Sequence, residues 1–288
     1  MKYRFIKNHR NEFPIRKMAA VLNVSKSRYY QWSKNPGVKE KRDFDLVERI
    51  GKIFDQSKKQ YGSPRIHSEL LDQGITCGHN RVAKIMRNKG IKARIKRKYK
   101  VTTDSNHDYP VAPNIVNRQF NVDSPNKIWV SDITYIWTNE GWLYLCIVLD
   151  LFSRKVVGWA MSRNIDTQLV ADSFTMAVLA RNPEKGLIFH SDRGIQYAAH
   201  DFRRLLKDNH AVQSMSRKGN CWDNACAESF FSTLKNEEVF HKNYRTRKEA
   251  RSSIFEYIAV FYNRFRKHTS LDYVSPEKYE KEWIRKIA

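Results

Sequence analysis

The spacing of apolar residues changes part of the way along the chain. Up to about residue 101 they recur every three to four positions, whereas from Pro125 onward come short runs rich in Val, Ile, Trp and Tyr. The first spacing is typical of amphipathic helices and the second of strands. The sequence therefore predicts an all-helical N-terminal part followed by a mixed α/β part.

Residues 14–33 are typical of two short helices joined by a turn. Apolar positions in 14–22 have helical spacing, and Ser25 is a good N-cap for a basic, aromatic helix over 26–32. This pattern fits a helix-turn-helix that binds DNA. A helical hairpin that only packs on its neighbour fits it equally well.

A second helical unit begins near Asp43 and ends in a strongly basic tract. A helix over about 78–88 carries Arg81 and Lys84, and seven of the twelve residues in 89–100 are basic. Such charge density favours contact with phosphates over a merely solvated tail. We expect DNA contacts from these helical residues and from three residues of the tract: Lys96, Arg97 and Lys98.

The α/β part predicts three antiparallel strands followed by alternating helices and strands. A strand in 186–190 leads to Asp192, and a later helix carries Glu228. The other expected strands are 128–137, 142–151, 155–161 and 211–214, and the other expected helices are 166–181, 199–209, 246–266 and 276–287.

Five segments follow from these patterns. Thr, Asn, Asp and Pro without apolar periodicity make 102–123 a linker. The other segments are a helix-turn-helix-like unit (1–40), a second helical DNA-binding unit with a basic tail (43–101), an α/β core (124–240) and C-terminal helices that brace the core (241–288).

The charge of the chain indicates a polyanionic partner. The formal net charge is +23, with 28 basic and 10 acidic residues in 1–118 but 25 basic and 20 acidic in 119–288. An excess of this size at one end favours nucleic acid over membrane. Solubility alone needs a much smaller charge.

Cysteine spacing and apolar content exclude other classes. The four cysteines form no C-x-x-C pair, which argues against a structural zinc site. The N-terminus has no apolar signal core, and no run has the length of a membrane span. We expect a cytoplasmic protein that acts on the nucleoid, without a membrane partner.

Three acidic residues are candidates for chemistry. Alternation places Asp132 in mid-strand on a largely apolar face, where a carboxylate is costly unless something compensates it. A hydroxyl or amide neighbour would suffice for one acid, but with Asp192 and Glu228 the set matches what Mg²⁺ prefers. Asp150, just before a turn, better suits an acid that bonds turn amides.

Several motifs resemble a known family. Thirty-five residues separate Asp192 from Glu228, and Lys235 follows seven residues later. These acids, Lys235 and four longer motifs resemble the second-frame transposase of two-frame bacterial insertion sequences, whose core is similar to that of retroviral integrases. The motifs are H-S-D-R-G-I-Q-Y, S-M-S-R-K-G-N-C-W-D-N-A, E-S-F-F-S-T-L-K and Y-N-R-F-R-K-H-T-S-L-D-Y-V-S-P-E.

The resemblance implies a fold and an activity. The expected fold is an α/β ribonuclease-H-like core, a mixed sheet of about five strands with flanking helices, preceded by all-α helix-turn-helix units. The expected activity is metal-dependent cutting at element ends, then strand transfer of the 3′-hydroxyl into DNA. Asp132, Asp192 and Glu228 would hold two Mg²⁺ or Mn²⁺ ions. The alternatives are a DNA-binding regulator with an inactive core and a simple nuclease.

The resemblance also implies partners. They are double-stranded DNA at element ends and targets, further copies of this chain on DNA, and an upstream-frame protein or frameshift fusion.

Around the acids we expect further contacts. Lys235 should be an exposed lysine two helical turns from Glu228, roughly 10 Å away by helical rise, and grip a DNA phosphate. Arg217 and Lys218 lie in a basic loop beside the site. His190 would touch substrate phosphate or hold its strand end, and Asn224 or Asp223 should cap the helix of Glu228.

Overall fold

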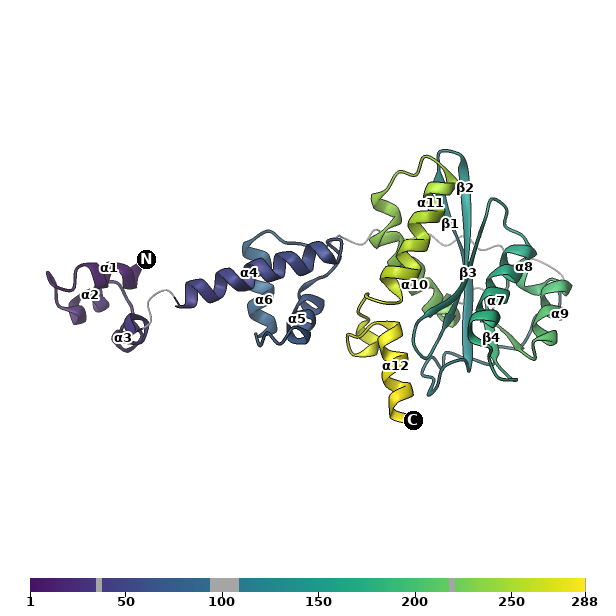
Figure 1. Ribbon diagram of the computed structural model, residues 1–288, viewed down its shortest axis with the longest axis horizontal. Coiled ribbons are helices and arrows are strands. Elements are labelled where there is room, and N and C mark those ends of the chain that lie inside the picture. Colours follow the sequence, from purple (N-terminus) through teal and green to yellow (C-terminus); the bar gives the residue numbers. More distant parts are fainter. Residues whose placement is uncertain (35–37, 94–108, 218–220, 288) are drawn as a thin grey trace. The chain divides into compact units, whose positions relative to one another are not determined.

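The computed structural model describes residues 1–34, 38–93, 109–217 and 221–287 (Figure 1). The chain divides into two compact units, Met1–Lys92 and Ala93–Ala288. No helix in the described residues is both long and apolar enough to cross a membrane.

Two sets of three helices make up the first unit. In the first set, Ile6, Met18 and Tyr29 form a small apolar core. Its helices are α1 (Lys2–Asn8), α2 (Ile15–Val21) and α3 (Lys26–Lys34). The Arg28 amide lies 3.4 Å from the Ser25 hydroxyl, in agreement with the predicted N-cap. The sequence patterns did not predict α1.

The second set buries apolar residues at helical spacing. Leu46, Ile50 and Ile53 of α4 are buried, as are Ile66 and Leu70 of the next helix. The three helices are α4 (Val38–Gln56), α5 (Ser63–Asp72) and α6 (His79–Asn88). Helix α4 starts five residues before the predicted position near Asp43, and Pro64 lies in the first turn of α5, where its missing N–H costs nothing.

A mixed five-stranded sheet organises the second unit, in the order β3-β2-β1-β4-β5. The first three strands form the expected antiparallel meander, while β4 and β5 run parallel to β1 and to each other. The strands are β1 (Ile128–Thr138), β2 (Gly141–Asp150), β3 (Val156–Ser162), β4 (Ile188–Ser191) and β5 (Val212–Met215).

Helices cover both sides of this sheet. In Figure 1, α7 and α9 lie on one side, and α10, α11 and α12 on the other. Their bounds are α7 (Thr167–Arg181), α8 (Ile195–Ala198), α9 (His200–Asp208), α10 (Ala225–Glu237), α11 (Arg247–Phe255) and α12 (Pro276–Ile287). Short 3₁₀ turns occupy Cys221–Asn224, Val239–His241 and Thr269–Leu271, and a π-helical stretch spans Glu256–Tyr262.

The main core lies between the sheet and α7. Trp129, Phe174 and Phe189 are fully buried there. Gly158 of β3 permits this packing, because a Cβ at that position would lie 2.2 Å from the Ser173 carbonyl oxygen. Asp166 caps α7 by accepting a hydrogen bond from the Leu169 amide at 2.9 Å, so the predicted helix over 166–181 is confirmed.

The segment before β1 packs on the sheet. The Met215 amide donates to the Pro113 carbonyl at 3.4 Å, and the Ile115 amide to the Ser214 hydroxyl at 2.9 Å. Residues 109–120, at the end of the predicted linker, are thus tied to β5 over part of their length.

Candidate active site

Strand register brings Asp132 and Asp192 to neighbouring positions. Parallel strands β1 and β4 pair Val130 with His190, and the two acids come two residues later on each chain segment. Asp132 Oδ1 accepts a hydrogen bond from the Ile133 amide at 2.8 Å, and Asp192 Oδ1 accepts one from the Gly194 amide at 2.9 Å.

The glycine of the H-S-D-R-G-I-Q-Y motif, Gly194, lies close to the Asp192 carboxylate. A Cβ on Gly194 would lie 3.0 Å from Asp192 Oδ1 and 3.0 Å from the Gln196 side-chain oxygen. The missing side chain therefore leaves room for the Asp192 carboxylate, and the Gly194 amide orients it.

Helix α10 brings Glu228 to the same place. Asn224 Nδ2, just before the helix, donates to the Ser131 carbonyl at 3.0 Å, next to Asp132. The expectation that Asn224 or Asp223 caps α10 through its side chain is wrong. Asn224 occupies the N-cap position but makes no capping bond, because its amide crosses to β1.

The three carboxylates act on one another electrostatically. Burial raises the pKa of Asp132 well above its usual range, and the charges of Asp192 and Glu228 raise it further. The pKa of Glu228 is likewise raised, first by burial and then by Asp192. In the described residues no three His, Cys, Asp or Glu side chains already form a compact metal-binding group. The acids thus form an open, mutually repelling set.

Lys235 is buried beside this set, contrary to expectation. Only 5% of it is exposed, and its Nζ lies 4.6 Å from the centroid of the Tyr135 ring. Burial lowers the pKa of Lys235 to about 8, an effect that the Asp132 charge opposes. The prediction of an exposed lysine failed because α10 packs against β1 along this part of its length.

Asp150 has the structural role that its position predicted. It accepts hydrogen bonds from the backbone amides of Asn126 at 2.7 Å and Phe152 at 2.8 Å, and lies 3.7 Å from the Arg181 guanidinium. Its oxygens are thus engaged by the segment before β1, by the turn after β2 and by Arg181.

His190 holds the end of β4 to β5. It is fully buried, with Nδ1 2.8 Å from the Ser214 hydroxyl and Nε2 3.2 Å from the Ser216 hydroxyl. Burial lowers the pKa of His190 to about 4, so the ring is neutral at pH 7. Of its two expected roles, these contacts favour support of the strand end.

Asp223, which the sequence offered only as a possible cap of α10, is a structural centre. Its buried carboxylate accepts hydrogen bonds from Arg217 Nη2 at 2.8 Å, Arg118 Nε at 3.0 Å and Asn114 Nδ2 at 2.9 Å. Hydrogen bonds from Arg217 hold the pKa of Asp223 well below its usual range. Two of these partners lie more than 100 residues away in sequence, so no local pattern could have indicated them.

The other predicted DNA contacts divide into two groups. Arg81 and Lys84 are exposed on α6, whereas Val82 and Met86 of the same helix are buried. Lys96, Arg97, Lys98 and Lys218 lie outside the described residues.

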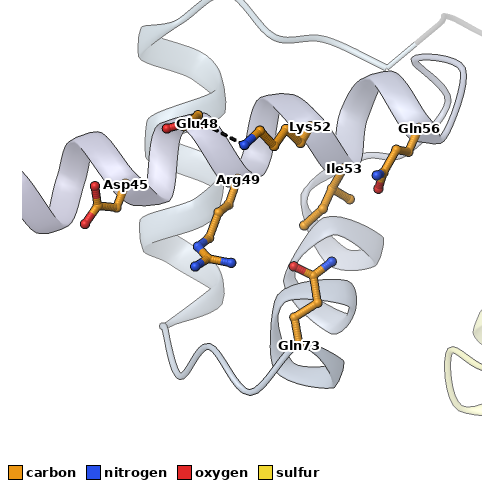
Figure 2. A pocket seen from close by; sticks show the side chains of 7 residues that line it. All are labelled: Asp45, Glu48, Arg49, Lys52, Ile53, Gln56 and Gln73. Atoms are coloured by element: carbon orange, nitrogen blue, oxygen red, sulfur yellow. Dashed lines mark ion pairs between the residues drawn. The ribbon is translucent and has the colours of Figure 1, made fainter.

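A hollow in the first unit does not look like a DNA site. Figure 2 shows Arg49 of α4 and Gln73, which follows α5, pointing into it, while Glu48 pairs with Lys52 at 2.6 Å. Its volume is about 270 Å³. Because acidic and basic side chains alternate around it, the hollow lacks the single sign of charge that attracts DNA.

Comparison with known families agrees with this arrangement. Residues 122–221 match the integrase core domain, 210–276 match a second integrase core domain model, and 41–99 match an HTH-like domain. Among solved structures, the HTLV-2 integrase catalytic core domain in complex with magnesium covers 55% of this chain and 97% of its own, at 15% identity and a TM-score of 0.41.

Full-length relatives are much closer in sequence. The transposase InsF for insertion sequence IS3A of Escherichia coli (strain K12) is 40% identical over 285 residues, 97% of this chain and 98% of that protein. A 31 kDa protein of insertion element IS600 from Shigella sonnei is 41% identical over 272 residues, 94% of this chain and all of that protein. The chain therefore belongs to the IS3 family of DNA transposases, with an HTH-like domain and an integrase core of the ribonuclease-H-like fold.

Proposed function

We propose that Asp132, Asp192 and Glu228 are the catalytic carboxylates of this transposase and that they hold two Mg²⁺ or Mn²⁺ ions. The observation that carries the proposal is their convergence from β1, the end of β4 and α10, close enough for their charges to raise the pKa values of Asp132 and Glu228. Such repulsion costs stability unless cations offset it. A structural role would not need three interacting acids.

The donor set fits a hard divalent cation. Carboxylate oxygens are the ligands that Mg²⁺ prefers, and an open set leaves coordination positions for water and substrate phosphate. Bound there, the ions would supply Lewis-acid stabilisation of the attacking and leaving oxygens. Lys235, beside Asp132, would place a cation against a phosphate near the scissile bond.

The proposed reaction has two steps at this site. In the first, water attacks the phosphodiester at an element end, and the broken P–O bond leaves a free 3′-hydroxyl. In the second, that hydroxyl attacks a target phosphodiester, so one P–O bond forms as another breaks and no external energy source is needed. The chain's own residues orient the strand for both attacks.

The assembly on DNA forms a second part of the proposal. We infer that the HTH-like domain over residues 41–99 holds double-stranded element ends through the exposed Arg81 and Lys84 and through Lys96, Arg97 and Lys98. Arg217 and Lys218 of the integrase core would add further DNA contacts. Because an element has two ends, copies of this chain would act together, with the upstream-frame protein as a further partner. We therefore expect the chain to act at the bacterial nucleoid.

The test separates binding from chemistry. Asp192→Asn should abolish cleavage and joining of a duplex that carries the terminal sequence of the element encoding this chain, since it removes a metal ligand. Its affinity for the duplex, measured by fluorescence anisotropy, should be equal or higher because a negative charge near phosphate is lost. Asp201→Asn, at an exposed acid on α9, is the matched control and should retain activity. Normal joining by Asp192→Asn would refute the assignment.

A further inference from the structure

Aromatic side chains gather at the tip of the β1–β2 hairpin. Trp137 and Trp142 lie opposite one another in the register, with ring centroids 4.8 Å apart, and Tyr135 packs edge-on against Trp142 at 5.0 Å. Trp137 is 56% exposed and Trp142 is 42% exposed. We call these three residues the hairpin aromatic patch. Exposed aromatic groups of this size mark binding surfaces more often than fold requirements.

The patch is continuous with the candidate active site. The Lys235 ammonium lies over the Tyr135 ring and close enough to Asp132 for each charge to affect the pKa of the other. The successive contacts from the acids outward therefore run through Lys235, Tyr135, Trp142 and Trp137. A strand with a phosphate at Lys235 would have its neighbouring nucleotides along these rings.

The tip is braced, as a binding platform must be. Arg247 at the start of α11 donates from its backbone amide to the Glu140 carboxylate at 2.8 Å and from Nε to the Trp142 carbonyl at 3.0 Å. Gly141 has φ +101°, and a Cβ there would lie 3.1 Å from Arg247 Nη2, so the turn requires glycine. Figure 1 shows the tip at the end of the sheet away from α12.

We propose that the hairpin aromatic patch binds an unpaired base of the DNA strand that passes through the active site. The proposal rests on the proposed function. A base offers a flat π-face that stacks on Trp or Tyr whatever its identity, which suits flanking DNA of variable sequence. Lys235 against the Tyr135 ring and Arg247 on the Trp142 carbonyl supply cations beside the patch for the adjoining phosphates. An unpaired base is available once strands separate near a cut end.

The experiment compares DNA with and without bases. Full-length chain is titrated into a fluorescein-labelled 12-nucleotide single strand and into an abasic strand of the same length, which carries the same phosphates but no rings. Trp137→Leu and Trp142→Leu should each weaken binding of the base-bearing strand about 5-fold or more, as loss of a stacking ring does, and leave abasic affinity unchanged. Trp137→Phe keeps an aromatic ring and should therefore retain most of the affinity for the base-bearing strand.

Two results would overturn the inference. One is that the Trp→Leu variants lose the same affinity for both strands, or lose none for either, while their melting curves match that of the unchanged chain. The other is conversion of an oligomer to a monomer by Trp137→Leu in sedimentation, with base-dependent binding intact, which would assign the patch to contact between copies. Because the binding assay needs no catalysis, either failure leaves the Asp192→Asn result, and hence the proposed function, to be judged separately.

Discussion

At the scale of single residues, the acids of this chain differ in what surrounds their oxygens. Asp150 has two backbone amides and an arginine, which engage its charge. Asp132 has one amide and the charge of Lys235, which only partly offset its burial and the like charges of Asp192 and Glu228. The sequence motifs led us to choose Asp132 over Asp150 as a candidate ligand, and that choice stays a prediction. They could not reveal that Lys235 is buried, because burial depends on how α10 packs.

Burial of Lys235 changes what its substitutions should do. Lys235→Ala should lower the free energy of unfolding by about 2 kcal/mol, since it leaves a cavity where the stem lay. Lys235→Met keeps the volume and removes the buried charge, so unfolding free energy should change by less than about 1 kcal/mol. Strand transfer should nevertheless fall in Lys235→Met, because the phosphate loses its cation.

Denaturant melts and a joining assay on the same preparations separate these effects. Full joining by a stable Lys235→Met variant would show that the cation serves packing and not DNA. We also expect Lys235→Arg to be less stable, as a larger group must enter a filled space.

Asp223 should make stability depend on acidity. Its pKa is lower in the folded chain than the unfolded value of about 3.9, so the stability it contributes is present above that value and is lost as pH falls through the folded pKa. Asp223→Asn should cost about 1–3 kcal/mol at pH 7 and less at pH 3. Urea unfolding at both pH values measures this, and an equal cost at the two would exclude the ion pairs as its cause.

At the scale of elements, apolar periodicity predicted most of the fold. All five strands and α7 lie within two residues of where the patterns put them. Helix α1 was missed because Ile6 is its one buried residue, so no apolar periodicity marks it. The helix expected over 246–266 changes from α to π form at Glu256. Nothing in the local sequence pattern marked this change.

Helix α12 depends on one buried carboxylate. Glu280 is 5% exposed and accepts hydrogen bonds from Arg181 Nη1 and Nη2 at 2.9 and 2.8 Å, from Lys155 at 3.1 Å and from Ser153 at 2.7 Å. Removing one partner of a buried ion pair leaves the others uncompensated. Glu280→Gln should therefore cost about 3–5 kcal/mol of unfolding free energy.

A residue on the same helix provides the control. Glu277 pairs with Lys281 at 2.6 Å, and its side chain is 28% exposed. Glu277→Gln should cost less than about 1 kcal/mol, as partly exposed pairs do. Equal midpoint shifts for the two variants in guanidinium unfolding would mean that α12 is not anchored through Glu280.

At the scale of the whole molecule, charge and chemistry divide between two parts of the chain. Most of the excess positive charge lies in residues 1–118, which include the HTH-like domain, whereas the interacting acids lie in the integrase core. The sequence predicted this division because both features can be read locally. The approach of Asn224 to Ser131, which positions Glu228, could not be predicted, since it joins segments 93 residues apart.

The central claim is that Asp132, Asp192 and Glu228 form one site for divalent ions. A crystal of the chain with Mn²⁺ and a DNA end, measured at the manganese absorption edge, tests this directly. We predict anomalous density in contact with the carboxylates of Asp132 and Asp192, and a second peak reached by Glu228 beside a DNA phosphate. Ordered Mn²⁺ bound elsewhere on the chain, with these three carboxylates free of it, would contradict the account.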